Sequence, residues 1–290
     1  LGDNNHAPHD WLEFAPTIFM QKTVKLPLMI FLHGGACDAF IETANTELHV
    51  LGEKENFFTV YATATNGYSW NNILHPDREN DVEYIEALIR HMINCYPIDS
   101  SRVYISGFSN GSGMAQVFAA SRPFLIAGVL AFNTRFRPTP QVILSVSEAK
   151  QKYDYRMPVY YSYGTKDAEY PLTDGCAQFS QIHFWKAYNN INDVPSSENS
   201  PSDVGAFANR MVSWGKYGKD GGKIFHTYEY DTLDTGHTNL YNYTVVDNLP
   251  HAVEPRIIPA GWTYLSRFSR NSDGSLNINK RKLEYELYEG

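Results

Sequence analysis

The stretch Arg102-Val103-Tyr104-Ile105-Ser106-Gly107-Phe108-Ser109-Asn110-Gly111 joins an apolar strand pattern to the motif G-x-S-x-G. Small residues follow directly at Ser112-Gly113-Met114-Ala115, and they predict a helix that begins at the turn. A serine held between a strand and a helix in this way can act as an exposed nucleophile. The glycines have a steric reason, because such a turn is strained and flanking side chains would clash. Ser109 is therefore the candidate nucleophile.

Length and composition limit the class of protein. The chain has 290 residues, of which 43% are hydrophobic, and its formal net charge is -8. An acidic chain is a poor candidate for binding nucleic acid or an anionic membrane surface. The sequence contains no apolar run of about 18 residues, so no membrane span is expected. The compartment, cytoplasmic or secreted, and the oligomeric state stay open.

The three cysteines are Cys37, Cys95 and Cys176, and no C-x-x-C spacing occurs. A zinc site is therefore not expected, and the sequence indicates no other metal or cofactor. Cys37 and Cys176 each lie near a candidate active-site segment. Whether these two cysteines form a disulfide stays open.

Strand and helix patterns alternate along the chain. Continuous apolar runs, typical of strands buried on both faces, alternate with segments of helical periodicity. The expected strands are residues 26–32, 57–62, 102–106, 125–132 and 159–163, and the expected helices are residues 81–96, 112–121, 177–189 and 255–268. This alternation predicts an α/β fold with a mostly parallel central sheet and helices on both faces, formed by a single domain over residues 1–290.

A polar segment interrupts this pattern. Residues 190–222 are rich in Asn, Ser, Pro, Gly and Asp, and they predict a loop or lid rather than a sheet element, within an insertion around residues 168–222. Residues 223–231 and 240–246 then predict a hairpin or an adjacent pair of strands.

A nucleophilic serine needs a base, and the base needs an acid that orients it. In this type of fold the acid and then the histidine follow the serine along the chain. Asp167 follows the strand at residues 159–163, with Asp174 as the next candidate. His251 follows the last expected strand and is the candidate base. His237 is the alternative, but it lies at a turn before that strand, which would place it at the opposite end of the sheet.

The intermediate of acyl transfer needs hydrogen-bond donors for its oxyanion. The amide of Asn110, directly after the serine, is one candidate. The others are the amides of Gly35 and Ala36 in the loop His33-Gly34-Gly35-Ala36, which follows the strand at residues 26–32. Glycines in that loop allow the backbone to approach a substrate closely, and His33 is a candidate residue of the substrate site.

These segments resemble the poly(3-hydroxybutyrate) depolymerase-like and feruloyl esterase-like branch of the α/β-hydrolases, carbohydrate esterase family 1 in the broad sense. The matching stretches are LPLMIFLHGG at residues 26–35, SWNN at 69–72, YPIDSSRVYISGFSNGSGMA at 96–115, GTKD at 164–167, and HA at 251–252. The resemblance implies Ser109, Asp167 and His251 as the catalytic triad, and Trp70 near the substrate cleft. Many members carry G-H-x-W-P at the catalytic histidine, whereas this chain has Leu249-Pro250-His251-Ala252-Val253.

The resemblance and the triad order together predict a serine esterase that needs no cofactor. The expected substrate is a small-molecule or polysaccharide-linked ester, with a hydroxycinnamoyl or other small acyl group. The alternatives are a depolymerase of poly- or oligo(3-hydroxybutyrate), an acyltransferase, and a non-catalytic binding protein on the same scaffold.

Overall fold

The computed structural model describes residues 10–21, 24–65, 68–153, 155–173, 178–195, 199–216 and 222–278. The strands of the main sheet are β1 (Trp11–Phe14), β2 (Leu26–Leu32), β3 (Phe58–Ala62), β4 (Ile98–Phe108), β5 (Gly128–Phe132), β6 (Val159–Gly164), β7 (Arg210–Trp214), β8 (Phe225–Asp231) and β9 (Asn239–Val246). The helices are α1 (Ala39–Thr46), α2 (Leu48–Glu55), α3 (Asp81–Cys95), α4 (Asn110–Ser121), α5 (Pro140–Lys152), α6 (Gln178–Tyr188) and α7 (Ile257–Leu265).

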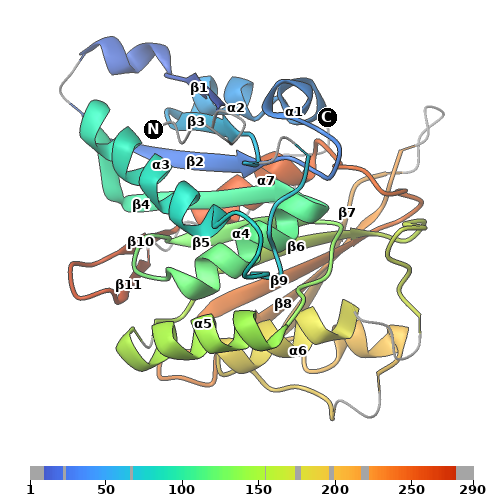
Figure 1. Ribbon diagram of the computed structural model, residues 1–290. Coiled ribbons are helices and arrows are strands. Elements are labelled where there is room, and N and C mark those ends of the chain that lie inside the picture. The colour runs from blue at the N-terminus through green and yellow to red at the C-terminus, as the bar shows by residue number, and fades with distance from the viewer. Residues whose placement is uncertain are drawn as a thin grey trace.

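These strands form one sheet in the order β1-β3-β2-β4-β5-β6-β9-β8-β7 (Figure 1). The pairs from β3 to β9 are parallel, and the outer strands β1, β8 and β7 pair antiparallel. The predicted mostly parallel sheet is therefore confirmed, as is the adjacency of β8 and β9. Because the carboxyl ends of parallel strands meet at one edge, the loops after β2, β4, β5, β6 and β9 come together there.

The core has one layer on each face of the sheet. Along β2, alternate residues point to opposite sides: Leu28, Ile30 and Leu32 belong to one buried cluster, and Met29 and Phe31 to the other. The first cluster includes residues of α3, α4, α5 and α6, and the second includes residues of α1, α2 and α7. Both faces are thus covered, as the continuous apolar runs predict, and Figure 1 shows the sheet between these layers.

The prediction of a loop or lid over residues 190–222 was wrong in one respect. Residues Arg210–Trp214 form β7, which pairs antiparallel with β8 at the edge of the sheet. An edge strand with mainly solvent-facing residues lacks the apolar run of a buried strand, so its composition resembles a loop. Its position in the sheet depends on backbone pairing with β8.

The expected closing helix at residues 255–268 is also shorter than predicted. α7 ends at Leu265, and Phe268–Arg270 (β10) instead pairs with Leu276–Ile278 (β11) in a small separate sheet. Cys37 and Cys95 are free thiols. Cys176 and Asp174 lie outside the described residues, as does the end of the chain after residue 278.

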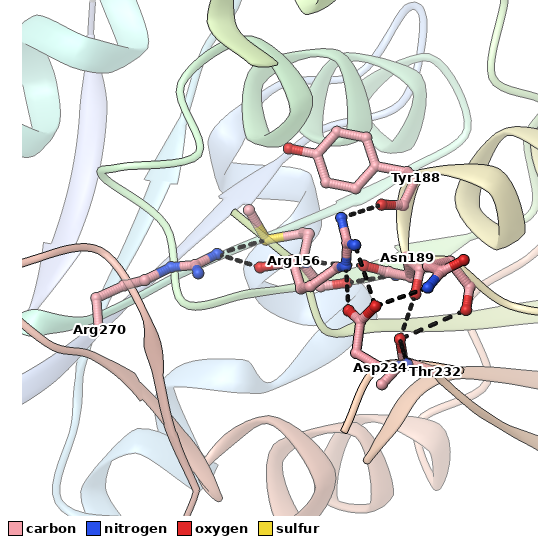
Figure 2. A network of polar contacts seen from close by, with 8 residues as sticks. Arg156, Tyr188, Asn189, Thr232, Asp234 and Arg270 are labelled. Carbon is pink, nitrogen blue, oxygen red and sulfur yellow. Dashed lines mark hydrogen bonds and ion pairs between the residues drawn. The ribbon is translucent and has the colours of Figure 1, made fainter. Parts of the chain in front are cut away.

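A polar network lies at the amino end of β6 (Figure 2). The Arg156 guanidinium donates to both carboxylate oxygens of Asp234, at 2.6 and 3.3 Å, and thereby holds the turn between β8 and β9. Arg270 donates to the backbone carbonyls of Arg156 and Ile126, at 2.7 and 2.9 Å. Burial lowers the pKa of Arg270 to about 10. This network anchors the edge of the sheet opposite to the carboxyl ends of the parallel strands.

Candidate active site

Ser109 occupies a strained turn between β4 and α4. Its backbone angles, φ 51° and ψ -119°, are unusual for a residue with a side chain. A Cβ added to Gly107 would lie 2.5 Å from the Gly111 carbonyl oxygen, and one added to Gly111 would lie 2.2 Å from that of Leu32. Both glycines of the motif are thus required by sterics, as the sequence indicates. The Ser109 amide donates to the Phe132 carbonyl at 3.0 Å, which ties the turn to the end of β5.

The structure brings Ser109, His251 and Asp167 together at the carboxyl edge of the sheet. His251 Nε2 lies 2.9 Å from Ser109 Oγ, and His251 Nδ1 lies 2.8 Å from Asp167 Oδ2. Asp167 is 2% exposed, and its other carboxylate oxygen accepts the amides of Glu169 and Tyr170, both at 2.9 Å. In this arrangement the carboxylate can hold the imidazole, and the imidazole can take the serine proton.

Several contacts position His251. Its ring packs against the rings of Phe108 and Tyr170, at centroid distances of 4.8 and 5.4 Å. The Asn133 side-chain amide donates to the carbonyl of Pro250, the residue before it, at 3.2 Å. Local sequence patterns do not reveal these contacts, because Phe108 ends β4, Asn133 follows β5 and Tyr170 lies in the loop after β6.

His237 lies in the turn between β8 and β9, where its amide donates to the Asp234 carbonyl at 3.1 Å. That turn precedes β9, whereas His251 follows it. The two histidines are therefore at opposite ends of the last central strand, and only His251 is within hydrogen-bond distance of Ser109.

The loop after β2 passes close to the serine turn. A Cβ on Gly34 would lie 2.9 Å from a ring carbon of Phe108, and one on Gly35 would lie 3.8 Å from Asn110 Cβ. The Ala36 amide donates to the Tyr68 carbonyl at 2.8 Å, so it is already engaged. The amides of Gly35 and Asn110 have no acceptor among the described residues, and they are the candidates that remain for an oxyanion.

Trp70 and His33 lie beneath this region and not on its surface. Both residues are 0% exposed, so neither offers a surface that a substrate could contact, and the expected role of either one in substrate binding would be indirect. Trp70 Nε1 donates to the His33 carbonyl at 3.0 Å. His33 Nε2 accepts the Ala64 amide at 2.9 Å, which places the ring proton on Nδ1, where it donates to the Gly34 carbonyl at 2.6 Å. Burial lowers the pKa of His33 and favours this neutral ring.

Segment 68–72 braces both halves of the candidate oxyanion site. At one end, the Tyr68 carbonyl accepts the Ala36 amide. In its middle, the Trp70 amide donates to Asn110 Oδ1 at 2.5 Å, and Asn110 Nδ2 donates back to the Trp70 carbonyl at 3.3 Å. At the other end, Asn72 Nδ2 donates to the Asn110 carbonyl at 3.3 Å. The segment therefore fixes the loop after β2 relative to the start of α4.

Replacing Asn110 by alanine keeps the backbone amide but removes the paired bonds to Trp70. We expect kcat for a small ester to fall by about 10- to 100-fold, because a displaced oxyanion donor stabilises the transition state less well. KM is expected to stay within about threefold, since ground-state binding does not use this donor. Steady-state kinetics with p-nitrophenyl acetate test this, with Asn94→Ala, exposed on α3, as the control. A kcat equal to that of the control would contradict the claim that the Asn110 side chain positions the oxyanion donor.

Glu42 of α1 supports the same loop from below. The carboxylate is 1% exposed and accepts the Gly34 amide at 3.2 Å. Burial raises the pKa of Glu42, so the folded protein takes up a proton at higher pH than the unfolded chain. The charged carboxylate is therefore unfavourable above its folded pKa, and this effect is relieved as the pH falls towards the ordinary value of about 4.3.

The difference in melting temperature, Glu42→Gln minus wild type, is expected to be most positive near pH 8 and to become smaller as the pH falls towards about 5. The reason is that acid stabilises only the wild-type residue. Thermal unfolding across this range measures the difference. Glu53→Gln is the control, since hydrogen bonds from Thr17 lower the pKa of Glu53 and move its titration below this range. A difference for Glu42→Gln that does not change with pH would contradict the expectation.

Comparison with known proteins identifies the family. Residues 58–205, about half of the chain, match the model of the Phospholipase/Carboxylesterase family. The chain belongs to this family. The matched region includes Ser109 and Asp167 and ends before His251.

Two curated relatives share part of the chain. A bifunctional acetylxylan esterase/xylanase of Neocallimastix patriciarum is 27% identical over 202 residues, which are 66% of this chain and 28% of the relative. Poly(3-hydroxyalkanoate) depolymerase C of Paucimonas lemoignei is 30% identical over 109 residues, which are 35% of this chain and 26% of the relative. The chain thus spans about a quarter of the length of each of these relatives.

Among solved structures, an acetyl xylan esterase from Aspergillus awamori aligns with a TM-score of 0.63 at 14% identity, covering 88% of this chain and 93% of that protein. At this identity the likeness shows the fold, which confirms the predicted α/β-hydrolase architecture. None of the helices in the described part of the chain is long and apolar enough to cross a membrane.

Proposed function

We propose that this protein is a serine hydrolase of carboxylic esters, with Ser109 as nucleophile, His251 as general base and acid, and Asp167 as the residue that orients the imidazole. The observation that carries the proposal is the unbroken chain of contacts from Ser109 Oγ to His251 and on to Asp167, at 2.9 and 2.8 Å. The membership of a phospholipase/carboxylesterase family supports the same chemistry.

The proposed reaction has two steps. His251 Nε2 takes the proton of Ser109 as the hydroxyl oxygen attacks the ester carbonyl carbon. The Gly35 and Asn110 amides stabilise the negative charge that develops on the carbonyl oxygen, together with the amino end of α4. The imidazolium then protonates the departing alcohol. Water, deprotonated by the same imidazole, attacks the acyl-enzyme and releases the acid and Ser109.

The proposed substrate is a small acyl ester, acetyl or hydroxycinnamoyl, carried by a plant polysaccharide. Support comes from the partial similarity to the acetylxylan esterase/xylanase. The surroundings of the triad also suit an ester on a bulky carrier, because Ser109 and His251 are partly exposed and the neighbouring Tyr68 side chain is 71% exposed. A hydroxyalkanoate ester is the second candidate, on the similarity to the depolymerase.

Ester hydrolysis and labelling of the serine test this function. Acetylated xylan, methyl ferulate, p-nitrophenyl acetate and a 3-hydroxybutyrate dimer form the substrate panel, with the Ser109→Ala protein as the blank. We expect a fluorophosphonate probe to label Ser109, and the polysaccharide-linked or hydroxycinnamoyl ester to have the highest kcat/KM. Fastest hydrolysis of the dimer would select the second candidate. The absence of both labelling and hydrolysis would refute the proposed function.

A further inference from the structure

Arg135 lies in the loop that follows β5, beside the candidate triad. The carbonyl of Phe132, the last residue of β5, accepts the Ser109 amide. The next residue, Asn133, holds the loop of His251 through the Pro250 carbonyl. Three residues of chain span at most about 11 Å, so the backbone of Arg135 lies close to both catalytic loops.

One nitrogen of the Arg135 guanidinium has no partner among the described residues. This Nε is shielded from solvent and has no hydrogen-bond acceptor in the described part of the chain, although the residue as a whole is only half-buried. A shielded donor without an acceptor is rare, because its desolvation is not compensated. Other arginines of the described chain do have a carboxylate within 4 Å, namely Arg90, Arg102, Arg122, Arg156, Arg210 and Arg256.

No carboxylate of the described residues accepts a hydrogen bond from Arg135 Nε at this edge. Arg137, two residues further on, and Lys166, in the loop after the adjacent strand β6, are exposed cations, and Glu169 in the same loop as Lys166 is exposed as well. The carboxylate of Asp167 is buried and already accepts hydrogen bonds from His251 and two backbone amides. A chain with a net charge of -8 therefore carries basic residues in two of the loops at the edge of the sheet where Ser109 lies.

We propose that Arg135 binds a carboxylate carried by the substrate, so that the preferred ester is anionic. This inference rests on the proposed esterase function, and it narrows the substrate class. A guanidinium offers parallel N–H donors that match the two oxygens of a carboxylate. The chemistry fits an ester on a uronic-acid-bearing saccharide, where the carboxylate is on the alcohol side, or a half-ester of a dicarboxylic acid, where it is on the acyl side.

Two pairs of isosteric esters separate these cases. 4-Acetoxybenzoate and 4-acetoxybenzamide differ in charge on the alcohol side, and monomethyl succinate and methyl succinamate differ on the acyl side. We expect wild type to have a kcat/KM about 10- to 100-fold higher for the anionic member of one pair, as for a charge-assisted hydrogen bond. The anionic-to-neutral ratio should fall to near one in Arg135→Gln, and be partly kept in Arg135→Lys. Arg137→Gln, which removes the same charge from an exposed position, should keep the ratio.

Several results would overturn the inference. One is a wild-type ratio near one in both pairs, a measurement that does not depend on any variant folding. Another is an equal fall of the anionic-to-neutral ratio in Arg137→Gln, which would indicate the overall electrostatic field of the basic residues and not a binding contact of Arg135. Hydrolysis of neutral esters without any anionic preference would refute the subsite and leave the esterase function standing.

A binding measurement decides the case in which no ester is hydrolysed. The melting temperature of the Ser109→Ala protein is measured in the presence of 4-acetoxybenzoate and, separately, of 4-acetoxybenzamide. A rise in melting temperature with 4-acetoxybenzoate but not with 4-acetoxybenzamide would support the subsite, even if the esterase function failed, provided that the double variant Ser109→Ala, Arg135→Gln loses this rise. Equal shifts with both compounds would refute it.

Discussion

The Ser109→Ala variant is expected to lose at least about 10⁴-fold in kcat/KM for any ester that wild type hydrolyses, since it removes the hydroxyl that is proposed to form the acyl-enzyme. His251→Ala should lose a similar factor, because the serine hydroxyl is a weak nucleophile without its base. The two losses should not add in the double variant, since both residues act in one step. Single-turnover kinetics with p-nitrophenyl acetate measure these factors.

His237→Ala is the matched control for this experiment. It removes the other histidine considered for the role, at the opposite end of β9, and it should keep activity within about twofold. Circular dichroism of each variant shows whether the fold is retained. Activity that survives in folded Ser109→Ala would refute the mechanism, and loss in His237→Ala alone would assign the base to His237.

The second large effect is expected for Gly111→Ala. The added Cβ would lie 2.2 Å from the Leu32 carbonyl oxygen and 2.3 Å from that of His33. Both atoms belong to backbone at the end of β2, which is buried and paired on both sides, so it cannot move aside. We expect a loss of about 3 kcal/mol or more in stability, seen as a much lower melting temperature or insoluble protein.

Two neighbouring glycines provide graded controls for stability. The Cβ of Gly35→Ala would lie 3.8 Å from its nearest atom, an ordinary contact, so its melting temperature should be near that of wild type. The Cβ of Gly113→Ala would meet the Asn72 side-chain nitrogen at 2.6 Å, a group that can turn away, so an intermediate effect is expected. Equal stability of all three variants would show that the backbone at Gly111 can adjust.

Much of the fold can be predicted from the sequence because its central elements have strong local patterns. The run Leu26–Leu32 is buried along its whole length and forms β2 within its predicted bounds. The helix expected at residues 81–96 forms as α3 over Asp81–Cys95. It ends just before Pro97, which cannot continue a helix. The edge strand β7 and the shortened α7 could not be predicted in this way, because pairing with β8 and with β11 decides those boundaries.

The sequence by itself determined the serine turn between two glycines, the order of serine, acid and histidine along the chain, and the parallel sheet. These features depend on sterics and periodicity within a few residues. Only the tertiary structure decided that Trp70 and His33 are buried braces, that Ala36 is engaged by Tyr68, and that Arg135 Nε has no partner among the described residues. The physical reason is that burial and hydrogen-bond partners depend on residues that are distant in sequence and meet only when the sheet has formed.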